Sequence, residues 1–190
     1  MESALSLAAG LALAAATGLR VFAPLLVLSL AARAGWIPLA PEFEWIASTP
    51  ATIAFGTASV AEVIAYYVPF VDNALDWLAA PVAITAGAVA GASLLTDLPP
   101  WLRYSVGLAG GGGIAGVVHS SAALVRLKSS ATTLGHGNFI LATIELAAAL
   151  VVSVVSLLFP LLALLTAAAL LIVVVWMAKR SARRRRAAPS

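Results

Sequence analysis

The sequence has no cysteine and few charged residues. Only 10% of its 190 residues are charged and 62% are hydrophobic, whereas a soluble domain carries about 25% charged residues. The absence of cysteine excludes disulfides, thiolate metal sites and cysteine nucleophiles. The shortage of charge excludes an ordinary water-soluble domain, because so apolar a chain would not stay dispersed in water. We therefore expect an integral membrane protein.

Signatures of hydrolases and of nucleotide binding are also missing. The chain contains no Gly-x-Ser-x-Gly, no His-Glu-x-x-His and no acid pair tied to a nucleophile by spacing. The glycine-rich run from Gly107 to Gly116 lacks the Gly-Lys-Ser/Thr ending of a phosphate-binding loop. Gly112 and Gly116 instead form a G-x-x-x-G pair, which is typical of close helix packing. We expect no enzyme and no cofactor.

The basic residues are concentrated near the C-terminus. Six of the eleven lysines and arginines lie in Lys179-Arg180 and Arg183–Arg186, directly after the last apolar run. Such a cluster is typical of a span end held in the cytoplasm near anionic lipid headgroups, and we expect no nucleic-acid partner. With six spans, Arg126 and Lys128 fall on the same side as this cluster, which places both termini in the cytoplasm.

Six apolar runs approach the length of roughly 20 residues that a bilayer span needs. The sequences around Glu62 and Glu145 are similar, and each glutamate is followed by a proline that leads another apolar run, Pro81 or Pro160. This repetition favours an all-α polytopic membrane protein built from two inverted three-helix repeats, although six helices with chance similarity are the alternative. The predicted spans are 5–32, 51–69, 77–95, 104–125, 138–158 and 160–178, and the predicted divisions are a first repeat (1–97), a second repeat (98–178) and a basic cytoplasmic tail (179–190).

The first apolar run contains a charged residue and two residues that disrupt helices. Arg20 lies near the middle of the run, between Gly18 and Pro24. Proline removes a backbone hydrogen bond and glycine allows local unwinding, so this stretch predicts a broken or re-entrant helix that presents Arg20. The alternative is a continuous helix in which Glu62 or Glu145 neutralises Arg20. The two interpretations are compatible, because a buried arginine needs an acidic partner or an anionic ligand.

The segment from residue 119 to residue 138 is rich in hydrogen-bond donors. It contains two cations, two histidines, an asparagine and several hydroxyl groups. Arginine and lysine supply charge, and hydroxyls and backbone amides complete the coordination of an oxyanion. The alternative is an ordinary cytoplasmic loop in which Asn138 caps the next helix. The predicted substrate-binding residues are Arg20, His119, Arg126, Lys128, Ser129, Ser130, Thr133 and Asn138.

The acidic residues in and beside the apolar runs allow three interpretations. A carboxyl group buried in a membrane can exchange a proton in each transport cycle, so Glu62 and Glu145 are candidates for proton coupling without any metal. Together with Asp72, Asp76 and the histidines, the same glutamates are candidate ligands in a cation or metal-ion pathway. In the third interpretation they only form structural ion pairs with arginines.

Three stretches, taken as a set, resemble one protein family. They are Thr17–Leu25, Glu62–Asp76, and Ser129–Asn138 with Glu145. In these stretches the chain resembles a family of small bacterial membrane proteins classed only as domain of unknown function 4126. The chain departs from the family's usual pattern at Phe139, where a proline is usual, and after Glu145, where a further acid is expected. The resemblance implies a multi-pass protein of the bacterial cytoplasmic membrane and implies no activity.

These features together predict a small membrane transporter or flippase for an anionic substrate. The substrate is expected to be a small anion or a phosphate-bearing lipid, and Glu62 or Glu145 would couple protons to its movement. The expected partners are membrane lipids, the anion or lipid headgroup, and a second copy of the chain packed through the glycine-rich run. A cation or metal-ion transporter is the first alternative, and a non-transporting membrane scaffold is the second.

Overall fold

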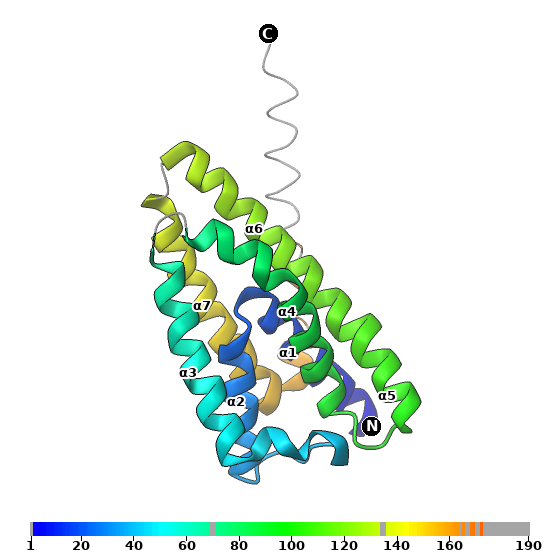
Figure 1. Ribbon diagram of the computed structural model, residues 1–190. Coiled ribbons are helices and arrows are strands. Elements are labelled where there is room, and N and C mark those ends of the chain that lie inside the picture. Colours follow the sequence, from blue (N-terminus) through cyan, green and yellow to red (C-terminus); the bar gives the residue numbers. More distant parts are fainter. Residues whose placement is uncertain are drawn as a thin grey trace.

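The chain is helical throughout the part that the structure, a computed structural model, describes (Figure 1). The described residues are 2–68, 71–133, 136–163, 165, 168, 169 and 172, and no strand occurs among them. The side chains of Asp72, Asp76, Thr133 and His136 lie outside this description. In chain order the elements are α1 (Glu2–Leu19), α2 (Phe22–Arg33), the 3₁₀-helix η1 (Pro41–Ala47), α3 (Thr49–Tyr66), α4 (Val71–Ser93), α5 (Pro100–Val106), the π-helical turn η2 (Gly107–Gly112), α6 (Gly113–Thr133) and α7 (His136–Leu158).

Helices α1 and α2 form a hairpin whose tip, at Arg20, is buried inside the molecule (Figure 1). Ser3, near the start of α1, donates a hydrogen bond to Asp97 at 3.1 Å. Beyond the end of α2, the Ala40 N–H donates to the Ser93 carbonyl at 2.8 Å. Because Ser93 and Asp97 are close neighbours at the end of α4, both outer ends of the hairpin lie at the same end of the molecule.

Proline chemistry explains why the helix breaks where it does. In a continuous helix the ring of Pro24 would clash with the carbonyl of Arg20, four residues earlier, and would leave that carbonyl without its N–H donor. In the first turn of a new helix the missing N–H costs nothing, since those N–H groups have no partner within the helix. Gly18 allows α6 to approach, because a Cβ there would lie 2.6 Å from the Ala115 carbonyl oxygen.

The hairpin confirms one prediction and corrects another. The predicted break near Arg20 is confirmed, and residues 5–32 do not form the single span that their length suggested. The prediction that both termini lie on one side assumed a single crossing by these residues, so its premise is not met. The C-terminal basic cluster itself lies outside the described residues.

The remaining long helices run alternately between the two ends of the molecule (Figure 1). α3 and α4 form one such pair. α5, η2 and α6 follow one another as a single rod, and α7 returns beside it. The predicted helices at 51–69, 77–95, 104–125 and 138–158 fall on these elements and are confirmed as helices, whereas 160–178 lies largely outside the described residues.

The two predicted repeats differ in their first element. The first half begins with the α1–α2 hairpin, and the second half begins with the continuous rod from Pro100 to Thr133. The rod contains a π-helical turn at Gly107–Gly112 and no break in the chain direction. The inverted repeat therefore stays a prediction that rests on the sequence.

Glycines bring the backbones of α1, α4 and η2 into contact. A Cβ on Gly10 would lie 2.7 Å from the Gly91 carbonyl oxygen, and a Cβ on Gly91 would lie 3.2 Å from the Gly111 Cα. Only residues without a side chain allow helices to approach this closely. This three-helix junction holds the outer part of α1 in place, while its inner end carries the tip with Arg20.

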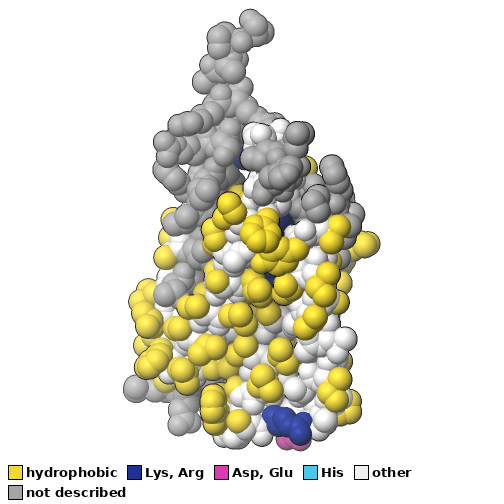
Figure 2. All heavy atoms as spheres, turned by 90° about the vertical axis from the view of Figure 1, so that its left-hand side faces the viewer, with side chains coloured by type: hydrophobic (Ala, Val, Ile, Leu, Met, Phe, Trp, Pro, Cys, Tyr) yellow, Lys and Arg dark blue, Asp and Glu magenta, His cyan; other side chains and the backbone are white. Residues whose placement is uncertain are grey.

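Apolar side chains cover much of the outer surface (Figure 2). Figure 2 shows them spread over the middle of one face, with a charged group at its lower end. Two helices, Pro100–Thr132 and Gly137–Leu158, are long and apolar enough to cross a membrane by length and composition. The exposed tryptophans Trp36, Trp45 and Trp101 gather near the end where the hairpin opens.

Candidate functional site

The break between α1 and α2 places a buried arginine at the centre of the molecule. Arg20 is 1% exposed. Its Nη2 donates to the Ala142 carbonyl at 3.0 Å and lies 3.4 Å from Oε2 of Glu145. Its Nε and Nη1 have no hydrogen-bond partner among the described residues. Buried polar atoms without a hydrogen-bond partner are destabilising, so their presence in this structure calls for a functional explanation.

A second buried arginine shares the same carboxylate and the same aromatic ring. Arg126 on α6 is fully buried and forms an ion pair with Oε2 of Glu145 on α7. The guanidinium carbon of Arg20 lies 3.8 Å from the centroid of the Tyr66 ring, and that of Arg126 lies 5.0 Å from it. A ring at these distances stabilises both cations through its π-electrons. Glu145 and Tyr66 thus hold the two arginines together.

Glu62 on α3 caps the start of α2. Its Oε1 accepts from the Val21 N–H at 2.8 Å, and its Oε2 accepts from the Phe22 N–H at 3.1 Å. The first N–H groups of a helix have no partner within it and form the positive end of its dipole. Val21 cannot cap the helix with its own side chain, so the carboxylate from α3 satisfies these donors.

Among the described residues, the arginines and glutamates of the cluster carry equal numbers of opposite charges. Glu62 and Glu145 balance Arg20 and Arg126, and the buried His119 on α6 also acts electrostatically on Glu62. Balance of this kind avoids uncompensated charge in an apolar interior. An anion that enters the cluster alone therefore gives it a net negative charge. A positive charge that enters with the anion keeps the net charge unchanged.

The donor-rich segment forms a second layer beside this cluster. The Asn138 side-chain amide donates to the Ser130 hydroxyl at 2.7 Å, and Asn138 is buried. Ser130 lies one helical turn beyond Arg126 on α6, and Asn138 lies two turns before Glu145 on α7. α7 already begins at His136, so Asn138 lies inside its first turn and does not cap it, contrary to the alternative reading of the sequence.

The other predicted site residues are placed less centrally or lie outside the description. Lys128 and Ser129 are half-buried on α6, in the turn that follows Arg126. The side chain of Thr133 is outside the described part. The structure thus brings Arg20, His119, Arg126, Glu62 and Glu145 into one cluster and Ser130 with Asn138 into the neighbouring layer.

A metal site finds no support within the described part of the chain. No three His, Cys, Asp or Glu side chains come together there in a way that would hold a metal ion. Glu62 is occupied by backbone N–H groups and Glu145 by arginines. Asp72 and Asp76, which the cation interpretation also needs, lie outside the described side chains.

Sequence reasoning missed Tyr66 and the backbone amides at the hairpin tip. Tyr66 is four residues after Glu62 on α3, so helical spacing places both on one face. That spacing could have indicated that Tyr66 lies beside Glu62 in the site. The amides of Val21 and Phe22 carried no such signal, since their role depends on the path of the chain after the break.

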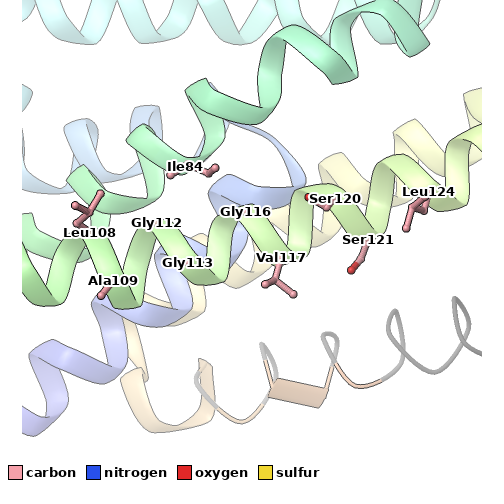
Figure 3. A pocket seen from close by; sticks show the side chains of 10 residues that line it. All are labelled: Ile84, Leu108, Ala109, Gly112, Gly113, Gly116, Val117, Ser120, Ser121 and Leu124. Atoms are coloured by element: carbon pink, nitrogen blue, oxygen red, sulfur yellow. The ribbon is translucent and has the colours of Figure 1, made fainter.

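A hollow of about 580 Å³ on the outer side of η2 and α6 is separate from the arginine cluster (Figure 3). Ile84 of α4 closes one side of it, beside Gly112 and Gly116, while Val117 and Ser121 point away from α4. A Cβ on Gly112 would lie 3.1 Å from the Ile84 carbonyl oxygen. The predicted glycine pair therefore serves packing within the chain, and self-association through it stays a prediction.

Comparison with known proteins identifies a family without an assigned activity. The model of the family described as domain of unknown function (DUF4126) matches residues 7–180. Searches of the curated proteins and of the solved structures found no significant match. The matched range includes every residue of the arginine cluster, and the family resemblance noted in the sequence is confirmed. Because the match covers most of its length, the chain belongs to the DUF4126 family.

Proposed function

We propose that this chain is an integral membrane protein that moves an oxyanion across the bilayer, either a small free anion or the phosphate of a lipid. The observation that carries the proposal is Arg20, which is 1% exposed and has two guanidinium nitrogens without a partner among the described residues. A guanidinium is a strong donor to phosphate and carboxylate oxygens. An oxyanion bound there removes the cost of the unsatisfied nitrogens.

Surface composition and helix length support the membrane location. Large apolar side chains are exposed along the long helices, with examples at Ile53, Leu108 and Val151. Exposed apolar surface on this scale is unfavourable in water and suits a lipid environment. Tryptophans at one end of the molecule fit the interfacial position that this residue favours.

Charge distribution supports an orientation in the bacterial cytoplasmic membrane. We place the α6–α7 connection in the cytoplasm, because Lys128 near the end of α6 then follows the usual excess of lysine and arginine on that side. The start of α1 lies at the opposite end of the molecule (Figure 1). The hairpin thus enters from the non-cytoplasmic side and brings its tip towards the cytoplasmic half.

The broken hairpin suits transport because it presents backbone donors deep in the molecule. Transporters bind charged substrates at discontinuous helices, where the positive N-terminal end of a half-helix faces the anion. In this chain that end belongs to α2, directly after Arg20. Arg126 and Glu145 keep Arg20 in position. Ser130 and Asn138 offer further polar atoms towards the cytoplasmic end.

Reconstitution into liposomes tests the proposal in two arms. In the first arm, purified protein is offered radiolabelled inorganic phosphate outside the liposomes. In the second, movement of fluorescent phosphatidylglycerol between leaflets is followed. Activity in one arm distinguishes a free anion from a lipid headgroup. Arg20→Gln should reduce the active arm by about tenfold or more, since it removes the charge that binds the oxyanion.

Arg33→Gln provides the matched control. Arg33 is exposed and, within the described part of the chain, donates only to the Thr49 hydroxyl at 2.6 Å, away from the hairpin tip. It should leave transport near the wild-type level. Full activity of Arg20→Gln, or an equal loss in both variants, contradicts the proposal.

The double ion pair of Glu145 favours one alternative, a membrane scaffold. A carboxylate that binds two buried arginines is also what a purely structural cluster would contain. A scaffold predicts no movement in either liposome arm. It also predicts that substitutions at Arg20 and Glu145 change stability alone.

A further inference from the structure

The N-terminal end of α2 already holds a carboxylate, and the protein itself supplies it. The two oxygens of Glu62 accept from the Val21 N–H at 2.8 Å and the Phe22 N–H at 3.1 Å. Free N–H groups at a helix N-terminus bind phosphate and carboxylate groups, helped by the helix dipole. Glu62 therefore occupies a position that suits a free oxyanion.

The unused donors of Arg20 are an independent sign of a ligand at this position. Arg20 lies in the break, directly before Val21, and is 1% exposed. Among the described residues, the hydrogen bonds of Glu62 come from the two backbone N–H groups, and Nε and Nη1 of Arg20 receive no acceptor. The Glu62 carboxylate, tethered to α3, accepts from the amides and not from these two nitrogens. The oxygens of a free phosphate group point in several directions and can accept from the amides and the guanidinium together.

Charged and titratable groups from several elements surround Glu62. Arg20 in the break and His119 on α6 act electrostatically on its carboxylate. Tyr66 lies one turn further along α3 and stacks on Arg20. From α6 and α7, the Arg126–Glu145 pair contacts Arg20 through the shared carboxylate.

We propose that Glu62 is a built-in substitute for the transported oxyanion and leaves the α2 amides when it takes up a proton. The inference rests on the proposed function and states how proton uptake is coupled to anion binding at the same site. A protonated carboxyl group is a poor acceptor for two N–H donors, so the amides of Val21 and Phe22 become available. One non-ester oxygen of a phosphate group then accepts from these amides, and another accepts from Arg20.

Charge balance makes one proton accompany each singly charged anion. The proton moves from water to a carboxylate oxygen of Glu62, and no covalent bond to the anion forms. The cluster then gains one positive and one negative charge, so its total is unchanged. Without the proton, the anion would share two arginines with two buried carboxylates, which is unfavourable in an apolar interior. A proton gradient thus drives the anion in the same direction as the proton.

Titration calorimetry on the purified full-length protein in lipid nanodiscs measures this coupling. Dimethyl phosphate serves as the main probe, because it carries one fixed negative charge and represents a lipid phosphodiester. Inorganic phosphate is titrated separately as the free anion. Buffers with different heats of ionisation report the protons taken up. We expect wild-type protein to take up about one proton per dimethyl phosphate bound. Glu62→Gln should bind with no proton uptake.

Two further variants separate the role of Glu62 from a general effect of charge. Glu44→Gln makes the same chemical change at an exposed residue of η1, so its proton uptake should equal that of wild type. Glu62→Asp keeps a titratable carboxyl group and should retain the uptake. Hydrogen exchange on wild-type protein adds a measurement that needs no variant. The Val21 and Phe22 amides should lose protection at acidic pH, after correction for intrinsic rates, and regain it with dimethyl phosphate.

The outcomes distinguish this inference from the proposed function. Anion binding without proton uptake, or uptake retained by Glu62→Gln, overturns the inference and leaves oxyanion transport standing. Amide protection that is independent of pH overturns it as well. If wild-type protein binds neither anion and moves nothing in either liposome arm, both the inference and the proposed function are wrong.

Discussion

At the scale of residues, one glutamate decides the different roles of two arginines. Oε2 of Glu145 forms the close pair with Arg126 and the longer contact with Arg20, at 3.4 Å. In the proposed function Arg126 is thereby a positioning residue and Arg20 is the anion-binding one, because Nε and Nη1 of Arg20 have no partner among the described residues. The sequence predicted these residues because charge in apolar runs is costly and stands out. It did not predict which glutamate binds which arginine, since that depends on the return path of the hairpin.

Removal of the shared carboxylate should destabilise the protein strongly. Glu145→Gln leaves two buried arginines without their ionic partner, and we expect a loss of about 3–5 kcal/mol in the free energy of unfolding. Equilibrium unfolding in mixed micelles measures this difference. Glu44→Gln, at an exposed position, should change stability by less than about 0.5 kcal/mol. Wild-type stability in Glu145→Gln would show that the ion pairs do not hold the cluster.

At the scale of elements, glycine packing fixes the hairpin that the sequence only partly predicted. Helices were predictable from apolar runs, and the break from Gly18 and Pro24. The return of the chain was not predictable, because an apolar run of that length fits one span equally well. The contacts that reveal the hairpin, such as Ser3 with Asp97, join residues far apart in the sequence. The role of the glycines in the α1–α4–η2 junction could not be predicted either, since the backbone atoms that they contact belong to other helices.

Replacing either of two glycines with alanine should change the stability of the protein in opposite directions. Gly10→Ala places a Cβ 2.7 Å from the Gly91 carbonyl oxygen, so the helices must separate, and we expect a loss of about 1–3 kcal/mol. The Cβ of Gly113→Ala would have no atom of another described element within 4 Å. Because alanine favours a helix over glycine, it should stabilise the protein by about 0.5–1 kcal/mol. Thermal unfolding in the same detergent compares them, and equal melting temperatures would refute the close junction.

At the scale of the whole molecule, composition says more about the class of protein than about its topology. The shortage of charge pointed to a membrane protein, and the exposed apolar side chains agree with that interpretation. The count of spans was less secure, because it treated residues 5–32 as one crossing. The side on which each segment ends depends on that count. Lysine and arginine counts alone therefore could not orient the N-terminus.

Single-cysteine labelling tests this topology directly, because the natural chain contains no cysteine. Ser3→Cys and Trp36→Cys lie at exposed positions on either side of the hairpin. Both should react with a membrane-impermeant maleimide from the same side of the membrane. Ala131→Cys, exposed near the other end of α6, should react only from the opposite side. Labelling of residues 3 and 36 from opposite sides would mean that α1 and α2 cross the bilayer once.

The most direct test of the account is an experimental structure of the protein in lipid nanodiscs with dimethyl phosphate at acidic pH. We predict an oxyanion within hydrogen-bond distance of Nε and Nη1 of Arg20 and of the Val21 and Phe22 amides, with Glu62 displaced from them. The contrary result is a structure at saturating dimethyl phosphate in which Glu62 still caps α2 and no anion lies beside Arg20. That result would contradict the assignment of Arg20 as an anion-binding residue.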